Sequence, residues 1–262
     1  MRNKFCIFFF EILQFRNVLF QLVSKQLILR YRRTFFGYLW TLFNPLMMMS
    51  IMAVVFSSLF KADLKSFSIF LFAGMIPWNF FNSVLTQSST AFIQNESLIK
   101  KIYLPKIIFP LSIAIALLID SFFSFIALFI IAIAIGGTLS WHIAIIPLVF
   151  ILLFLFAFGL SLILSIVTVF FRDLQYLINM GMQGLYFLTP ILYKKEDLAG
   201  KINSIIEINP LTPFIDLFRT LIYYNRLPDL EIIIQTSLIS TLSLILGLLF
   251  FIFNEKKIVF RL

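Results

Sequence analysis

Few side chains in this sequence could carry out covalent chemistry. The chain holds one histidine, His142, and a single cysteine. Catalysis on a sugar or lipid usually calls for paired carboxylates, a histidine with a partner or a metal cluster, and the pair Glu196-Asp197 is expected to be solvated in a loop. The only Gly-Lys pair, Gly200-Lys201, lacks the other residues of a phosphate-binding Walker A loop. We therefore predict no catalytic residue, no metal site, no cofactor on this chain and no ATP hydrolysis by it.

Asp120 is the one charged residue that falls inside a long apolar stretch. An ionisable residue within a membrane helix is costly and marks a functional site by default. Asp120 has no acidic neighbour at helical spacings of three, four and seven, and no apolar stretch holds a Lys or Arg that could pair with it. We favour a carboxylic acid kept neutral or hydrogen-bonded between helices over a proton carrier, because a proton-coupled transporter usually needs more than one such acid.

A stripe of polar and aromatic residues could contact a sugar chain. Its members recur at intervals of three and four, which places them on one face of a helix: Tyr176, Asn179, Gln183, Tyr186, Pro190 and Tyr193. Amides that faced lipid would leave their hydrogen bonding unmet, so this face should meet protein or water. This face is either a helix–helix contact held by hydrogen bonds from the amides or a channel wall along which a glycan slides. A weaker stripe of similar character comprises Phe43, Met47, Ser50, Val54 and Ser57.

The elements that position these residues are long apolar stretches separated by short charged intervals. Hydrophobic residues make up 61% of the chain and charged residues 13%, against about 25% charged in soluble domains. A membrane helix needs about 20 apolar residues. We predict an all-α integral membrane protein, not a soluble enzyme, in which residues 1–38 precede one membrane domain, residues 39–262. The six predicted transmembrane helices cover residues 39–60, 67–92, 107–135, 143–171, 176–193 and 232–253.

The basic residues predict the orientation of these spans. If both termini are cytoplasmic, fourteen of the 21 Lys and Arg residues lie inside and seven outside, as the positive-inside rule requires. The net charge of +9 therefore indicates membrane topology and contact with anionic lipid, not a nucleic-acid surface.

The segment before the first span has the pattern of an amphipathic helix. Its apolar residues recur at helical spacing: Phe15, Val18, Leu19, Leu22 and Val23. A basic and aromatic cluster follows and abuts the first span, which favours a helix that lies in the membrane interface. The alternative is a cytosolic helix whose apolar face packs on the protein itself.

Six motifs, in this order along the chain, resemble landmarks of the type-2 ABC permeases that export polysaccharides. They are residues 30–40 with Asn44-Pro45, residues 72–81, residues 95–105, Phe171-Arg172-Asp173, residues 189–193, and residues 209–219. Thr34 and Phe36 stand where Ser and Leu would be expected. The fourth and fifth motifs resemble the O-antigen and teichoic-acid exporters more than the capsule exporters.

The resemblance implies a homodimer in the bacterial cytoplasmic (inner) membrane, joined to two copies of a separate cytosolic ATPase subunit that binds MgATP. The implied function is export of a lipid-linked glycan, carried on undecaprenyl diphosphate, through a channel between the protomers. The first and fifth spans would line this channel with Phe43, Met47, Ser50, Asn179, Gln183, Tyr186 and Tyr193. Residues 194–230 would form re-entrant helices between the fifth and sixth spans that cap its outer mouth.

The resemblance also suggests two cytoplasmic sites. Residues 95–105 suit a short helix that docks into the ATPase, with Asn95, Glu96, Ser97, Leu98, Lys100 and Lys101 in the coupling contact. Arg30, Arg32 and Arg33 would sit where a lipid diphosphate enters, or would only anchor the chain by the positive-inside rule.

Two other classes of function stay open. A type-2 ABC exporter of drugs or small lipids would share the topology but would lack a continuous aromatic path. An integral enzyme that processes glycans would need carboxylates facing one water-filled cavity, which the residues do not provide.

Overall fold

The computed structural model describes residues 11, 13–31, 36–134, 141–195 and 206–262. Every regular element within these residues is a helix, as predicted. The elements are α2 (Arg16–Tyr31), η1 (Gly37–Leu39), α3 (Trp40–Leu59), α4 (Leu64–Ser89), α5 (Ala91–Gln94), α6 (Glu96–Lys101), α7 (Ile108–Ala134), η2 (Trp141–Ile145), α8 (Ile146–Phe170), α9 (Leu174–Leu188), α11 (Thr212–Ile222) and α12 (Leu230–Arg261).

Four of the helical stretches in the described part of the chain are long and apolar enough to cross a membrane. They are α4, most of α7, η2 continued by α8, and α12. The second, third, fourth and sixth predicted spans are therefore confirmed as candidate spans. Within α3 the apolar stretch covers Leu46–Leu59, and α9 has 15 residues, about 22 Å of helix against a hydrocarbon core of about 30 Å. The first and fifth spans stay predictions.

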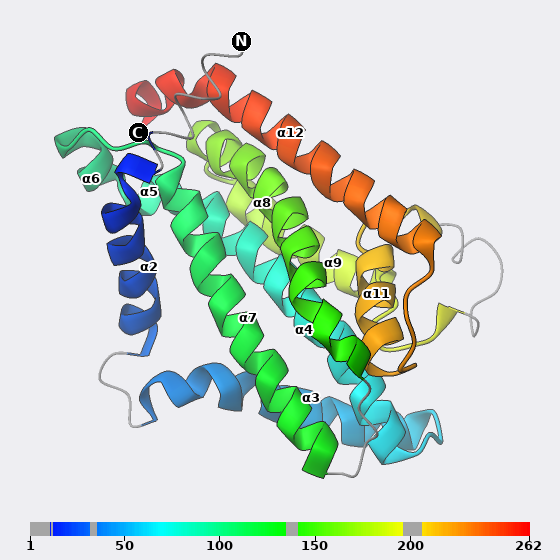
Figure 1. Cartoon of the computed structure of the whole chain (residues 1–262). Helices are drawn as coiled ribbons and strands as arrows, with labels where there is room; N and C mark the ends of the chain where they lie inside the picture. The colour runs from blue at the N-terminus through cyan, green and yellow to red at the C-terminus, as the bar shows by residue number, and fades with distance from the viewer. Residues whose placement is uncertain (1–10, 12, 32–35, 135–140, 196–205) are drawn as a thin grey trace.

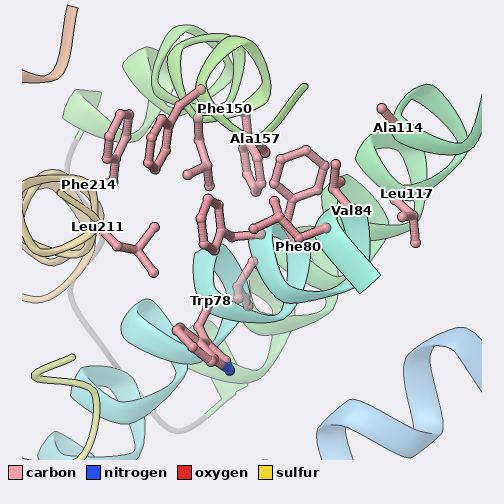
Figure 2. Close-up of a cluster of buried hydrophobic side chains, with 14 of the residues drawn as sticks. Trp78, Phe80, Val84, Ala114, Leu117, Phe150, Ala157, Leu211 and Phe214 are labelled. Carbon is pink, nitrogen blue, oxygen red and sulfur yellow. The ribbon is translucent and has the colours of Figure 1, made fainter. Parts of the chain in front are cut away.

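The core lies where α8 contacts α4, α7, α11 and α12. Figure 2 shows its aromatic and aliphatic side chains, with Phe80 from α4, Phe150 from α8 and Phe214 from α11. The rings of Phe81 and Phe156 stack with 5.1 Å between their centres. This contact joins α4 to α8, and the stacked rings of Phe156 and Phe214, with 5.2 Å between their centres, join the short helix α11 to α8.

Small residues let α12 run close along α8 (Figure 1). A Cβ atom on Gly247 would lie 2.2 Å from the carbonyl oxygen of Gly159, so the two backbones touch directly. The hydroxyl of Ser240 donates to the Leu152 carbonyl at 2.7 Å, and that of Ser243 donates to the Phe156 carbonyl at 2.9 Å. Small residues and interhelical hydroxyl bonds are the usual means by which membrane helices associate.

The predicted amphipathic helix is present as α2, but its apolar face is covered by protein. Leu22 and Val23 are buried, Val18 and Leu19 are half-buried, and α2 contacts α7. The apolar face that was expected to rest on the membrane thus packs at least in part on the protein itself, which is the alternative that the sequence left open. A position of α2 at the membrane surface stays a prediction.

The start of α2, the short helix α6 and the end of α12 lie at one end of the molecule (Figure 1). The Tyr103 hydroxyl reaches the Glu11 carboxylate at 3.5 Å, and the Arg261 guanidinium lies 5.8 Å from the centre of the Phe170 ring. The α3–α4 turn and α11 lie toward the opposite end. Both described chain ends therefore share one side of the molecule, and we predict that this side is cytoplasmic.

Candidate functional site

A groove of about 650 Å³ lies between α4 and α9. One wall comes from α4 and the other from α9; the lining residues are Trp78, Asn82, Thr86, Asn179, Met182, Gln183, Tyr186 and Phe187. The polar members repeat every three or four residues on both helices, so each helix turns one polar and aromatic face into the groove. Asn179, Gln183 and Tyr186, three of the predicted channel residues, are thus brought together.

Tyr186 on α9 contacts both α4 and α3 at the edge of the groove. Its ring meets the Trp78 ring in a T-shaped contact with 5.4 Å between the centres, and its hydroxyl lies 3.7 Å from the sulfur of Met52 on α3. Asn179 and Gln183 are exposed, whereas Tyr186 is half-buried. The groove therefore offers exposed amide donors and acceptors beside aromatic rings held in place by packing.

The α4 wall was not anticipated from the sequence. Trp78, Asn82 and Thr86 are spaced four residues apart in the second span, and this spacing could have indicated a second polar stripe. The Thr86 hydroxyl donates to the Asn82 carbonyl at 2.8 Å, so it is satisfied within its own helix. Trp78 is 4% exposed and Asn82 is half-buried, so Asn82 carries most of the recognition chemistry that α4 can supply.

The first-span stripe lies apart from this groove. Phe43, Met47 and Ser50 are exposed on α3 and do not line the groove. A neighbouring side of α3 packs inward through Met49 and Ala53. The two predicted stripes therefore do not share one surface within a single chain, and their common channel role stays a prediction.

The fifth-span stripe ends earlier than predicted, because α9 stops at Leu188. Thr189 precedes Pro190, and a residue before proline is disfavoured in helical conformation. Tyr193 therefore does not continue the face of Asn179 and Gln183. Its hydroxyl folds back and donates to the Phe187 carbonyl at 2.7 Å.

Side chains satisfy the carbonyls that the end of α9 leaves open. Besides the Tyr193 bond, the Thr189 hydroxyl donates to the Leu185 carbonyl at 2.7 Å. The Asn209 amide donates to the Leu188 carbonyl at 3.3 Å and to the Thr189 hydroxyl at 2.9 Å. Non-helical backbone at membrane depth is tolerated only where protein or water meets its polar groups, and here Asn209 from a later segment performs that task.

Arg219, which the sequence places among the external charges, is buried with 3% of its surface exposed. Its guanidinium donates to the Ile191 carbonyl at 2.7 Å and lies 3.6 Å from the centre of the Phe70 ring. A Cβ atom on Gly74 would come within 3.1 Å of the same group. The signal that could have revealed this burial is the spacing within α11, in which Arg219 lies four residues after Ile215 and three before Ile222.

The predicted coupling segment forms the six-residue helix α6. Asn95 is buried and donates to the Ala91 carbonyl at 2.8 Å. Lys100 donates to the Glu96 carboxylate at 2.6 Å, and this hydrogen bond and charge lower the pKa of Glu96. Ser97 and Lys101 are exposed.

The hydrophobic residues of this segment divide between two surfaces. Leu98 and Ile99 pack partly against the core of their own chain, so Leu98 is less available for docking than predicted. Ile102 and Tyr103, which follow α6, are 56% and 75% exposed. Both lie within the predicted docking segment, residues 95–105, and they present the apolar surface that a docking partner could cover.

Comparison with known proteins decides the family. The family of ABC-2 type transporters matches residues 17–223, most of the chain. The chain belongs to this ABC-2 family. The permease is 33% identical over 245 residues to an O-antigen export system permease protein RfbA of Klebsiella pneumoniae, which covers 92% of each chain.

Two further relatives cover most of the permease. It is 28% identical over 236 residues to the O-antigen export system permease protein RfbA of Myxococcus xanthus, with 89% of this chain and 91% of the relative aligned. It is 22% identical over 242 residues to the polysialic acid transport protein KpsM of Escherichia coli, with 90% and 92% aligned. The order of these identities agrees with the resemblance to O-antigen exporters.

Some candidate residues of the permease lie outside the structural description. Arg30 falls in the last turn of α2, but its side chain and the whole of Arg32 and Arg33 lie outside the described residues. Asp120 is buried in α7, and its backbone carbonyl accepts from the Ser124 hydroxyl at 3.0 Å. Within the described part of the permease, no group of three or more His, Cys, Asp or Glu residues could hold a metal ion.

Proposed function

We propose that this chain is the transmembrane subunit of an ATP-driven exporter that moves a lipid-linked polysaccharide, such as an O-antigen or a teichoic acid, out across the bacterial cytoplasmic membrane. Membership of the ABC-2 family and the names of the relatives support this class of substrate. The observation that carries the proposal is the groove between α4 and α9.

The groove has the chemistry that a moving sugar chain requires. The half-buried ring of Tyr186, which packs on the buried ring of Trp78, offers a flat apolar surface with a polar rim, and the amides of Asn82, Asn179 and Gln183 can donate to and accept from sugar hydroxyls. Each contact is weak and resembles its neighbours, so a polymer can be held at many positions and still advance. A pocket for a compact apolar drug would instead be lined predominantly by hydrophobic side chains.

A second copy of the chain would complete the path. Of the residues of α9, Met182 is buried, while Tyr176, Met180 and Phe187 are exposed. Exposed amides on a membrane helix need water or protein beside them. In the proposed homodimer, the partner covers the outer surface of α9 and encloses the groove, and the exposed face of α3 supplies a further wall.

ATP hydrolysis would be coupled to transport at the end of the molecule that carries α6. Two ATPase subunits, each holding MgATP, would bind α6 and the exposed Ile102 and Tyr103. Arg30, Arg32 and Arg33 would receive the diphosphate of the lipid carrier on the same side, since guanidinium groups pair with phosphates in a bidentate manner.

A complementation experiment tests the proposal. The permease is expressed with its ATPase subunit in a bacterium whose own O-antigen exporter is deleted, and surface polysaccharide and intracellular lipid-linked glycan are both measured. We expect surface glycan to be restored and the intracellular pool to fall, and we expect the double variant Asn179→Leu and Gln183→Leu to reverse both at equal membrane level. Efflux of small drugs with no change in either glycan pool would favour the drug-exporter alternative and overturn the proposal.

A further inference from the structure

We propose that the permease carries a second ligand site, distinct from the α4–α9 groove, that binds an amphiphile with a phosphate group. The site consists of two adjoining pockets toward the end of the molecule opposite α6. A cationic pocket of about 310 Å³ and an apolar pocket of about 780 Å³ share Phe70 and Lys194 in their linings. We call them the cationic pocket and the apolar pocket.

The cationic pocket has an excess of positive charge. Its described lining holds four cationic side chains, from Lys194, Lys195, Arg219 and Arg226, and one carboxylate, from Asp216. Asp216 forms an ion pair with Lys195. The lining therefore favours an anion, and a phosphate can accept charge-assisted hydrogen bonds from several cations at once.

Arg219 is the cation of this pocket whose position is fixed by the protein. Its side chain is buried, and the bond to the Ile191 carbonyl and the contact with the Phe70 ring hold its guanidinium in one orientation. A guanidinium held in advance loses little conformational entropy when an anion binds. The amino group of Lys194 lies 5.9 Å from the centre of the Tyr223 ring, and the guanidinium of Arg226 lies 5.4 Å from that of Tyr224. Ring contacts of this kind leave the charge of both cations in place.

The apolar pocket lies directly beside these charges. Phe60, Phe67, Phe70 and Leu192 supply most of its apolar surface, and Tyr193 and Tyr223 also line it. The carboxylate of Asp63 lies in the same lining, where it accepts from the backbone N–H of Ser66 at 2.9 Å and caps the start of α4. The hydroxyl groups of Ser66 and Tyr223 are 3.1 Å apart and bond to each other, which reduces their demand for a polar ligand. Hydrocarbon fits this lining, and a phosphate at Lys194 would then sit where the hydrocarbon ends.

The natural ligand that this chemistry suggests is a prenyl phosphate head group on the side of the membrane to which the glycan is delivered. The assignment of this natural ligand rests on the proposed function. The prediction that the two pockets bind a prenyl phosphate does not. A phosphate could also come from solution as a free anion. The apolar pocket distinguishes the two sources, because a free phosphate has nothing to place in it.

Binding to the purified full-length permease in phosphatidylcholine nanodiscs, together with its ATPase subunit, tests the proposal without any glycan. Farnesyl diphosphate, inorganic diphosphate and farnesol are titrated, with empty nanodiscs as the partition control. We expect farnesyl diphosphate to bind about tenfold or more tightly than either of the others, because it alone fills both pockets. Equal affinity for inorganic diphosphate would overturn the amphiphile assignment, and absence of binding would overturn the site.

Variants at the exposed edge of the two pockets, which leave Arg219 in place, test whether farnesyl diphosphate binds at this site. The double variant Lys194→Gln and Arg226→Gln should weaken farnesyl diphosphate about tenfold, whereas Phe60→Ser should weaken it and leave inorganic diphosphate unchanged. The matched control is Lys256→Gln with Lys257→Gln, which removes the same charge from exposed positions near the other end of the molecule. An equal effect of both double variants would mean that the anion responds only to net charge, and would overturn the site. Failure of polysaccharide export with farnesyl diphosphate binding intact would overturn the proposed function alone.

Discussion

The ring of Tyr186 on α9 meets the ring of Trp78 on α4 with 5.4 Å between their centres and 64° between their planes. The Tyr186 hydroxyl also lies 3.7 Å from the Met52 sulfur on α3. One side chain thus joins three predicted spans at the wall of the groove. Its removal should therefore change both the surface that faces a glycan and the contact among the helices.

Substitution of Tyr186 separates the ring from its hydroxyl. Tyr186→Ala should reduce polysaccharide export about three- to tenfold, since an aromatic contact is worth about 0.5–1.5 kcal/mol beyond its burial. Tyr186→Phe keeps the ring and should retain most export. Tyr176→Ala is the matched control, because Tyr176 is exposed on the same helix outside the groove. Equal loss in Tyr176→Ala would mean that α9 acts as a packing surface.

Cysteine labelling tests whether water reaches the groove between α4 and α9 during turnover. In a Cys6→Ser background, Gln183→Cys should react with a water-soluble thiol reagent, because Gln183 lines the groove and is exposed. Leu185→Cys should stay protected, since Leu185 packs partly against the core. Equal labelling, or protection of both, would place the path elsewhere.

The contact between Gly159 and Gly247 should limit what α8 and α12 tolerate. Gly247→Ala would place a Cβ atom 2.2 Å from the Gly159 carbonyl oxygen, so the helices must separate at a cost of about 1–3 kcal/mol or more. We expect a lower midpoint of thermal unfolding in detergent. Gly184→Ala is the control, because nothing lies within 4 Å of its added Cβ, and a similar loss there would show that the tight contact is not the cause.

Exposed residues at and beyond α6 should decide ATPase docking. Ile102→Asp with Tyr103→Ala should reduce co-purification of the ATPase subunit about fivefold or more, as expected for an apolar contact worth over about 1 kcal/mol. Glu96→Gln, which removes the ion pair with Lys100, should lower export while the fold is retained. Full co-purification and export in all these variants would remove residues 95–105 from the ATPase contact.

The basic cluster can be tested by charge and by geometry. Changing Arg30, Arg32 and Arg33 together to Gln should reduce export of lipid-linked glycan at normal membrane level. The triple Lys variant keeps the charge and loses the planar fork, so a partial loss is expected. Normal surface glycan in the Gln variant would leave the cluster with a topological role only.

Four predicted spans and one face of the groove follow from the sequence because both depend on local spacing. Apolar stretches of about 20 residues predict membrane helices, and Asn179, Gln183 and Tyr186 must share a face on any helix of 3.6 residues per turn. The short helices α6 and α11 are also local features. Their hydrophobic residues recur at helical intervals within a few turns.

Only the tertiary structure decides which of these faces meet. It brings Trp78 and Asn82 opposite Gln183, covers the apolar face of α2 with α7, and buries Arg219 against Phe70 and Ile191. Pairing of this kind depends on the shapes of two surfaces at once, such as the small residues Gly159 and Gly247 that let α8 and α12 touch. No spacing within a single helix carries that information, because the partner surface lies far away along the chain.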